Sequence, residues 1–211
     1  FVPAGVYDAE GATGDDFRTV GGDYYKPTDA DYEANCEEAR ALLAEAGYPD
    51  GEGFPVVEYL YNTSDAHKAV AEALQYMWEE ELGVKVTLNN QEWAAFLQTR
   101  KDGDYSIARN GWIADYNDPI SFLDMWMTGG GNNDAQYANE EYDSLIKEAK
   151  TTTDVKERME LLHKAEDKII GEDNALAPLY FYTQKYMLAD GIEGLYYCPL
   201  GYFFFGYTHQ A

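Results

Sequence analysis

One segment of the chain gathers several side chains that can bind charged groups. Residues 109–119 have the sequence Arg-Asn-Gly-Trp-Ile-Ala-Asp-Tyr-Asn-Asp-Pro, which supplies a guanidinium at Arg109, an indole at Trp112 and carboxylates at Asp115 and Asp118. Arg can hold a carboxylate through two parallel hydrogen bonds, Asp can hold an ammonium group, and Trp offers a flat apolar face. Together these groups suit a small zwitterion such as a peptide. The alternative is a loop in which Arg109 pairs with its own Asp115 or Asp118.

A second segment, residues 62–67, has the sequence Asn-Thr-Ser-Asp-Ala-His and contains several residues that favour helix N-caps. We expect it to lie between a strand and the N-terminus of a helix, where free backbone N–H groups and the helix dipole favour an anion. His67 would lie in the first turn and could hydrogen-bond a carboxylate. It also precedes Val70 by three residues on the expected apolar face, so position alone favours a core histidine over a ligand contact.

The sequence gives little support for catalysis. It has no G-x-S-x-G motif, no H-E-x-x-H motif and no phosphate-binding loop. Asp115 and Asp118 could form the carboxylate pair of a glycoside hydrolase, but pairs of Asp in loops are mostly structural. We therefore expect a protein that is not an enzyme and that uses no cofactor.

The histidines and cysteines do not form a metal-binding pattern. His67, His163 and His209 are scattered, and Cys36 and Cys198 are far apart without the spacing of metal ligands. The sequence is equally compatible with one disulfide and with two buried thiols. We expect no metal site.

Hydrophobic spacing predicts the elements that position these residues. Predicted strands cover residues 56–61, 84–88, 105–109 and 177–182, and predicted helices cover residues 31–46, 65–82 and 93–100. Two more helices are predicted after residue 140. The first carries Tyr142, Ile146 and Ala149 at helical spacing, and the second begins with Asp154 and Glu157, arranged like a capping box, and carries Met159 and Leu162 inward. The first two strands and the helix between them form a βαβ unit, which implies parallel pairing. Residues 1–27 have no sustained period and are predicted to be irregular. The predicted fold class is α/β, in which ligands gather beyond the carboxyl ends of the strands.

Charge limits the classes of partner. The chain of 211 residues carries 39 acidic and 15 basic residues, a formal net charge of -24. Such a surface repels phosphate backbones and anionic lipids, so we expect no binding to nucleic acid or to membrane surfaces. The sequence has no apolar run of about 18 residues that could span a membrane. Nineteen Tyr and four Trp residues would suit a pocket that accepts varied ligands, although a Tyr-rich core accounts for most of them.

Several short motifs, in the same order along the chain, make the sequence similar to one known family. The chain resembles the oligopeptide-binding proteins of ABC importers in residues 42–48, 60–68, 90–93, 96–97, 99–100 and, above all, 108–119. The likeness runs from near residue 1 to about Tyr182, and less tightly to the end.

The resemblance implies a two-lobed, periplasmic-binding-protein-like fold of class II, which closes on an extended peptide. By this resemblance, residues 1–182 are the C-terminal lobe, and residues 183–211 are a tail that crosses back toward a missing N-terminal lobe. The implied protein is an extracytoplasmic monomer, in the periplasm or lipid-anchored at the cell surface as a lipoprotein. Its implied partners are short peptides and the permease of an ABC importer.

The resemblance also implies roles for individual residues. The residue in the position of Asp115 binds the α-amino group of the peptide, and those matching Arg109 and His67 meet its carboxylate. The other matched positions are two pocket-wall aromatics and two residues near the ligand: Trp93, Trp112, Asn62 and Tyr182. Asn110 and Ile113 depart from the residues expected in the family, which leaves the pocket's size and side-chain preference open. Another cargo, such as an oligosaccharide or a metal chelate, stays an alternative because a shared fold does not fix the ligand.

Overall fold

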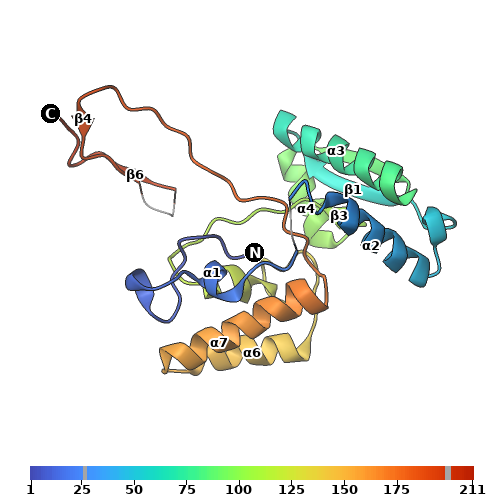
Figure 1. The fold of residues 1–211 in the computed structure, drawn as a ribbon, viewed down its shortest axis with the longest axis horizontal. Helices are drawn as coiled ribbons and strands as arrows, with labels where there is room; N and C mark the ends of the chain where they lie inside the picture. The colour runs from blue at the N-terminus through green and yellow to red at the C-terminus, as the bar shows by residue number, and fades with distance from the viewer. Residues whose placement is uncertain (26–27, 198–200) are drawn as a thin grey trace. The chain divides into compact units, whose positions relative to one another are not determined.

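The computed structural model describes residues 1–25, 28–197 and 201–211 (Figure 1). The chain divides into two compact units. Unit 1 comprises Phe1–Tyr24 and Trp112–Ala211, and unit 2 comprises Tyr25–Gly111. The predicted division into residues 1–182 and 183–211 does not coincide with the boundaries of these units, and it stays a prediction.

Unit 2 is an α/β unit built on a parallel sheet of three strands. Its elements in chain order are α2 (Tyr32–Glu45), the 3-10 helix η2 (Pro49–Gly51), β1 (Val57–Asn62), α3 (Asp65–Leu82), β2 (Val86–Gln91), α4 (Trp93–Asp102) and β3 (Ile107–Ala108). The strand order is β2-β1-β3, and β1 pairs in parallel with both neighbours. The predicted βαβ unit and the α/β class are therefore confirmed.

The central strand β1 is covered on both faces, as parallel strands usually are. Its last four residues are all buried, and alternate side chains point to opposite faces. Tyr59 and Tyr61 share a hydrophobic cluster with Ala71 and Trp78 of α3, the helix that runs along the sheet in Figure 1. Phe96 of α4, which also contacts β1 and β2, is fully buried. Both α3 and α4 therefore pack against this one short sheet.

The strand order sets up a place where ligands gather in α/β sheets. The chain passes from β1 through α3 to β2, and then returns through α4 past β1 to β3. The two consecutive connections therefore run in opposite directions across the sheet, which creates a topological switch point at the carboxyl ends of β1 and β3. Asn62 ends β1 and Arg109 follows β3 at this point.

Unit 1 is mainly helical. Its elements are η1 (Gly11–Thr13), α1 (Phe17–Gly21), α5 (Ile120–Leu123), η3 (Asp124–Trp126), α6 (Glu140–Thr151), α7 (Val155–Glu166) and the π-helical turn η4 (Asp167–Glu172), followed by four two-residue strands, β4 (Ile192–Glu193), β5 (Tyr196–Tyr197), β6 (Phe203–Phe204) and β7 (His209–Gln210). Helices α6 and α7 lie side by side (Figure 1). Trp126, Tyr142, Ile146 and Leu162 are buried in the core between these elements. The expected cap at Asp154 is confirmed, because its carboxylate accepts a hydrogen bond from the Glu157 N–H at 3.0 Å.

Two predicted segments differ from the structure. Residues 177–182 were expected to form a strand but have no regular structure. Their apolar composition favours a strand, yet a strand also needs a neighbour to accept its backbone hydrogen bonds, and the described residues supply none there. Residues 1–27 are not wholly irregular, because they include α1, and Val2 and Phe17 are buried in the core of unit 1. The strand predicted at 84–88 is shifted to β2 (Val86–Gln91), and the strand predicted at 105–109 is shortened to β3 (Ile107–Ala108).

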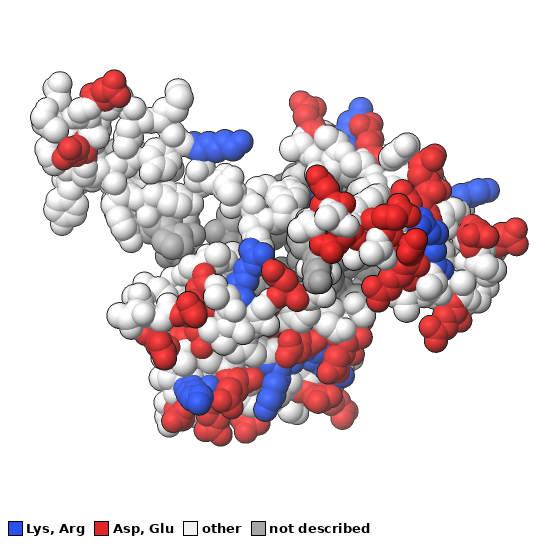
Figure 2. All heavy atoms as spheres, in the orientation of Figure 1, with Lys and Arg blue, Asp and Glu red and all other residues white. Residues whose placement is uncertain are grey.

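Charged side chains are unevenly distributed along the chain (Figure 2). Acidic residues are common in both units, but the tail of residues 183–211 has only Lys185, Asp190 and Glu193. That tail exposes large apolar side chains instead, and they include Tyr186, Met187, Tyr202, Phe204, Phe205 and Tyr207. Large exposed apolar surface of this kind usually marks an interaction surface.

Candidate functional site

The first group of predicted site residues lies at the switch point of unit 2. Arg109 is anchored by its backbone N–H, which donates to the carbonyl oxygen of Leu60 at 2.8 Å. Its guanidinium Nη1 lies 3.5 Å from Oδ1 of Asn62, at the outer limit of a hydrogen bond. Asn62 itself is buried. The two strand ends therefore hold a guanidinium and an amide side by side, and both can bind a carboxylate.

His67 lies in the first turn of α3 and joins this group. It is partly buried, and that burial lowers the pKa of its imidazole below the ordinary value. The positive charge of Arg109 lowers the pKa further, and a hydrogen bond with the backbone of Asn62 opposes these effects. The lowered pKa favours the neutral imidazole, which lies in the field of Arg109. This position suits a second contact to an anion, although the assignment of His67 as a ligand residue stays a prediction.

Trp93 and Gln91 extend the same edge of the sheet. Gln91 ends β2 opposite Asn62, and its Oε1 accepts a hydrogen bond from Thr99 Oγ1 at 2.8 Å. Trp93 begins α4, is 53% exposed and stacks on Phe96 with the ring centroids 5.8 Å apart. An indole held by a buried ring and open on its outer side offers a flat apolar wall beside the strand ends.

Asn110, one of the departures from the family pattern, has a structural role. Its Oδ1 accepts hydrogen bonds from Arg100 Nη1 at 2.9 Å and from the Gly111 N–H at 2.8 Å. Arg100 also lies over the ring of Phe96. Asn110 thus ties the residue after Arg109 to α4.

The second group lies in unit 1, in the loop that follows Gly111. Trp112 packs against the core, and its Nε1 donates to the carbonyl oxygen of Ser121 at 2.7 Å. The Asp115 N–H donates to Ser121 Oγ at 3.1 Å. The Asp115 side chain is exposed, and its carboxylate forms no ion pair or hydrogen bond with the residues that the structure describes. Among the described residues, Asp115 is thus a negative charge without a partner, in a loop that is bonded to Ser121 at both Trp112 and Asp115.

Asp118 has the opposite character. Its two carboxylate oxygens accept hydrogen bonds from Arg158 at 2.9 and 2.8 Å, and Oδ1 also accepts one from the Ile120 N–H at 2.9 Å. A carboxylate engaged in this way is a structural anchor. The pairing of Arg109 with Asp118 stays an alternative. With both oxygens held by Arg158, Asp118 is poorly placed to act with Asp115 as a hydrolase pair.

Tyr182 lies in the irregular segment of unit 1. Its side chain is 62% exposed, and its hydroxyl lies 3.4 Å from that of Tyr180. The seven predicted residues are thus divided between the units, with Asn62, His67, Trp93 and Arg109 in unit 2 and Trp112, Asp115 and Tyr182 in unit 1. Sequence reasoning missed Ser121, since nothing in its neighbours signals two hydrogen bonds to a loop six to nine residues earlier.

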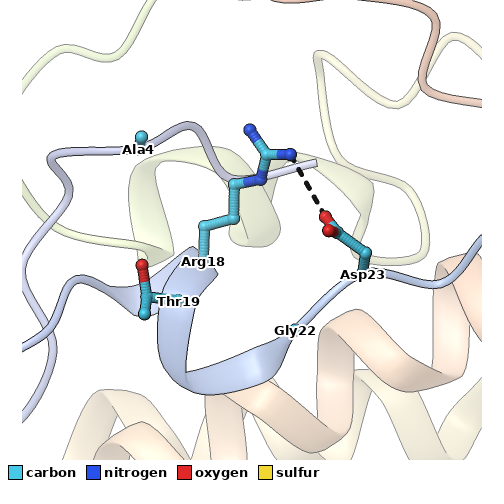
Figure 3. Close-up of a pocket in the computed structure, with 5 residues that line it drawn as sticks. All are labelled: Ala4, Arg18, Thr19, Gly22 and Asp23. Atoms are coloured by element: carbon cyan, nitrogen blue, oxygen red, sulfur yellow. Dashed lines mark hydrogen bonds and ion pairs between the residues drawn. The ribbon is translucent and has the colours of Figure 1, made fainter. Parts of the chain in front are cut away.

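A surface hollow in unit 1 contains none of these residues (Figure 3). It is lined by Ala4, Arg18, Thr19, Gly22 and Asp23. Arg18 is paired with Asp23 at 3.1 Å, and both side chains are well exposed. The hollow therefore offers a ligand no free charge in a protected position.

The described part of the chain gives no sign of a metal site or a membrane span. No three or more His, Cys, Asp and Glu side chains gather there in a way that could hold a metal ion. Cys36 is buried as a free thiol, and Cys198 lies outside the described residues. No helix in the described ranges is both long enough and apolar enough to cross a bilayer.

Comparison with known proteins identifies the family. Residues 5–134, more than half of the chain, match the sequence model of the bacterial extracellular solute-binding proteins, family 5. The chain belongs to this family. This chain is 37% identical over 203 residues to the dipeptide-binding protein DppE of Bacillus subtilis (strain 168), and the match covers 95% of this chain and 36% of DppE. It is 42% identical over 158 residues to the periplasmic oligopeptide-binding protein OppA of Salmonella typhimurium, which covers 75% of this chain and 29% of OppA.

A solved structure shows the same fold. The structure of Haemophilus influenzae OppA in complex with RPPGFSPFR superposes with a TM-score of 0.67 at 37% sequence identity, over 75% of this chain and 31% of that one. The α/β fold of oligopeptide-binding proteins is thereby confirmed. This chain spans about a third of the length of these relatives.

Proposed function

We propose that this chain is part of a receptor that captures short peptides outside the cell and delivers them to an ABC importer. The observation that carries the proposal is the Asp115 carboxylate, which is exposed and forms no ion pair with the described residues, in a loop that Ser121 fixes at both Trp112 and Asp115. Relatives named as dipeptide- and oligopeptide-binding proteins support the same cargo class. All these relatives are solute-binding proteins, so no catalytic step is proposed.

The two groups of residues suit the two ends of a peptide. Asp115 would bind the α-amino group, and Arg109 with His67 would bind the carboxylate, next to Asn62. The termini are the features that every peptide shares, so a receptor for many sequences should grip them and leave the side chains in roomy, hydrated pockets. Trp93, Trp112 and Tyr182 would supply apolar walls for those side chains. Closure of two lobes would remove water from the Asp115–ammonium pair and so strengthen it.

The rest of the proposed receptor lies beyond this chain. Residues 1–182 would form the C-terminal lobe, and residues 183–211 would extend to an N-terminal lobe. The exposed aromatic side chains and sparse charge of that tail support this role, as does the small share of the relatives' length that the chain spans. We place the monomeric receptor outside the cytoplasmic membrane, in the periplasm or lipid-anchored at the cell surface.

The test compares peptides with a free and an acetylated N-terminus in the full-length receptor. Asp115→Asn should weaken binding of the free-amine peptide by about 2–4 kcal/mol, because it leaves the desolvated ammonium group without its partner. The acetylated peptide should already bind poorly to the wild type. Calorimetric titration measures both affinities, and Asp15→Asn, which removes an exposed charge elsewhere in unit 1, is the matched control.

Equal wild-type affinity for the free and acetylated peptides would contradict the proposal. A thermal-shift screen separates the other cargo classes, because a response to oligosaccharides or metal chelates alone would exclude peptides. Cleavage of a peptide or glycoside library that is lost in Asp118→Asn would instead support a hydrolase.

A further inference from the structure

Ser121 holds both ends of the short segment that carries the proposed ammonium ligand. Its carbonyl oxygen accepts the Trp112 Nε1–H at 2.7 Å, and its Oγ accepts the Asp115 N–H at 3.1 Å. One residue thus fixes the indole at the beginning of the segment 112–115 and the backbone at its end. Ile113, between them, is 73% exposed, whereas Trp112 and Ala114 pack against the core of unit 1.

Ser121 is itself rigidly placed. It is 4% exposed and lies in α5 between Ile120 and Phe122, which are both buried in the core of unit 1. Its backbone N–H donates to the carbonyl oxygen of Asp118 at 3.1 Å.

Asp118 is in turn bound to α7, a helix of the unit 1 core, through one ion pair. Both oxygens of Asp118 are held by Arg158 of α7, and the two side chains are only 25% and 20% exposed. The segment 112–115 is therefore connected to a core helix by a short series of hydrogen bonds through buried or partly buried groups.

We infer that Ser121 is a positioning residue for the N-terminal end of a bound peptide, an inference that rests on the proposed function. Its hydroxyl fixes the backbone from which the Asp115 carboxylate projects, so the carboxylate meets the ammonium group without first losing the freedom of a mobile loop. Its carbonyl oxygen fixes the plane of Trp112 beside the same terminus. No residue of the peptide needs to touch Ser121.

The experiment measures amine discrimination, the ratio of affinities for a free-amine peptide and its N-acetylated form, in the full-length receptor. Ser121→Ala removes the hydroxyl that accepts the Asp115 N–H and should lower this ratio about 3- to 10-fold, the size of one hydrogen bond. Ser121→Cys nearly preserves the side-chain volume but supplies a weak acceptor, so it should act in the same direction if the alanine variant does not fold. Ser144→Ala removes a hydroxyl that bonds the Glu140 carbonyl oxygen on α6, and it should leave the ratio unchanged.

The outcomes separate this inference from the proposed function. An equal loss of affinity for both peptides would show that Ser121 only stabilises the fold, and an unchanged ratio would show that it does not position Asp115. If Asp115→Asn abolishes amine discrimination while the Ser121 variants keep it, only the inference about Ser121 fails. If Asp115→Asn keeps the discrimination, the proposed role of Asp115 fails as well. Equal wild-type affinity for the two peptides would contradict the proposed function itself.

Discussion

At the scale of single residues, two identical side chains in one loop have opposite environments. Asp118 accepts three hydrogen bonds, two of them from Arg158, whereas the Asp115 carboxylate has no such partner among the described residues. A carboxylate that is already satisfied cannot gain much from a ligand, while an exposed one without an internal partner can. Asp118 therefore has a structural role, and Asp115 is available for binding.

The position of His67 leads to a pH prediction. Burial and Arg109 hold its pKa below the ordinary value of 6.5, and a carboxylate bound beside it would raise that pKa. Between the two pKa values binding takes up a proton, so affinity for a peptide with a free C-terminus should rise as the pH falls. We expect a gain of roughly 3- to 10-fold from pH 7.5 to 5.5, measured by titration calorimetry in the full-length receptor.

Two controls test the origin of that gain. His67→Gln should abolish it, and a peptide with an amidated C-terminus should show none with the wild type. A gain that persists in His67→Gln would place the titrating group elsewhere.

At the scale of elements, the end of α3 depends on a close approach between backbones. Gly83 ends the helix in the left-handed conformation, with φ of 65°. A Cβ at this position would overlap the carbonyl oxygen of Asp50 in η2. The turn at η2 therefore packs directly on the C-terminus of the helix whose first turn carries His67.

Gly83→Ala should destabilise this chain by about 2–4 kcal/mol, because it adds a steric overlap to the cost of a left-handed residue. The control is Gly47→Ala, where φ is 96° and nothing lies within 4 Å of the added Cβ. That variant should lose only about 1–2 kcal/mol. Urea unfolding measures both free energies, and equal losses would show that the contact with Asp50 contributes nothing.

At the scale of the whole molecule, the dominant property is the formal net charge of -24. Like charges repel one another more strongly in a compact chain than in an expanded one, so the folded state carries the larger electrostatic cost. Salt reduces this cost, because the screening length falls to about 10 Å at 0.1 M.

Raising NaCl from 20 to 300 mM at pH 7 should therefore raise the Tm of this chain, by about 3 °C. Scanning calorimetry provides the measurement. The same series near pH 4.2, the isoelectric point, should show little change because the net repulsion is gone there. A Tm that falls with salt at pH 7 would mean that attractive ion pairs such as Arg158–Asp118 outweigh the repulsion.

The amount that sequence predicts differs between the parts of the candidate site. The switch-point group followed from local patterns, because a strand, a capping segment and a periodic helix place Asn62 and His67 at a sheet edge. The strand at 177–182 failed because strand formation depends on a partner that local sequence does not contain. The shift of β2 to Val86–Gln91 has the same origin, since register is set by pairing with β1.

The sequence alone determined the α/β class, the helix positions and the residues with the chemistry to bind a zwitterion, because these depend on side-chain type and on spacing along the chain. Only the tertiary structure decided that β3 lies next to β1, that Arg158 binds the carboxylate of Asp118, and that Ser121 accepts hydrogen bonds from Trp112 and Asp115. Each of these is a contact between residues at least six positions apart in the sequence. Which partner a polar group finds at that distance depends on how the whole core packs, and no local pattern records it.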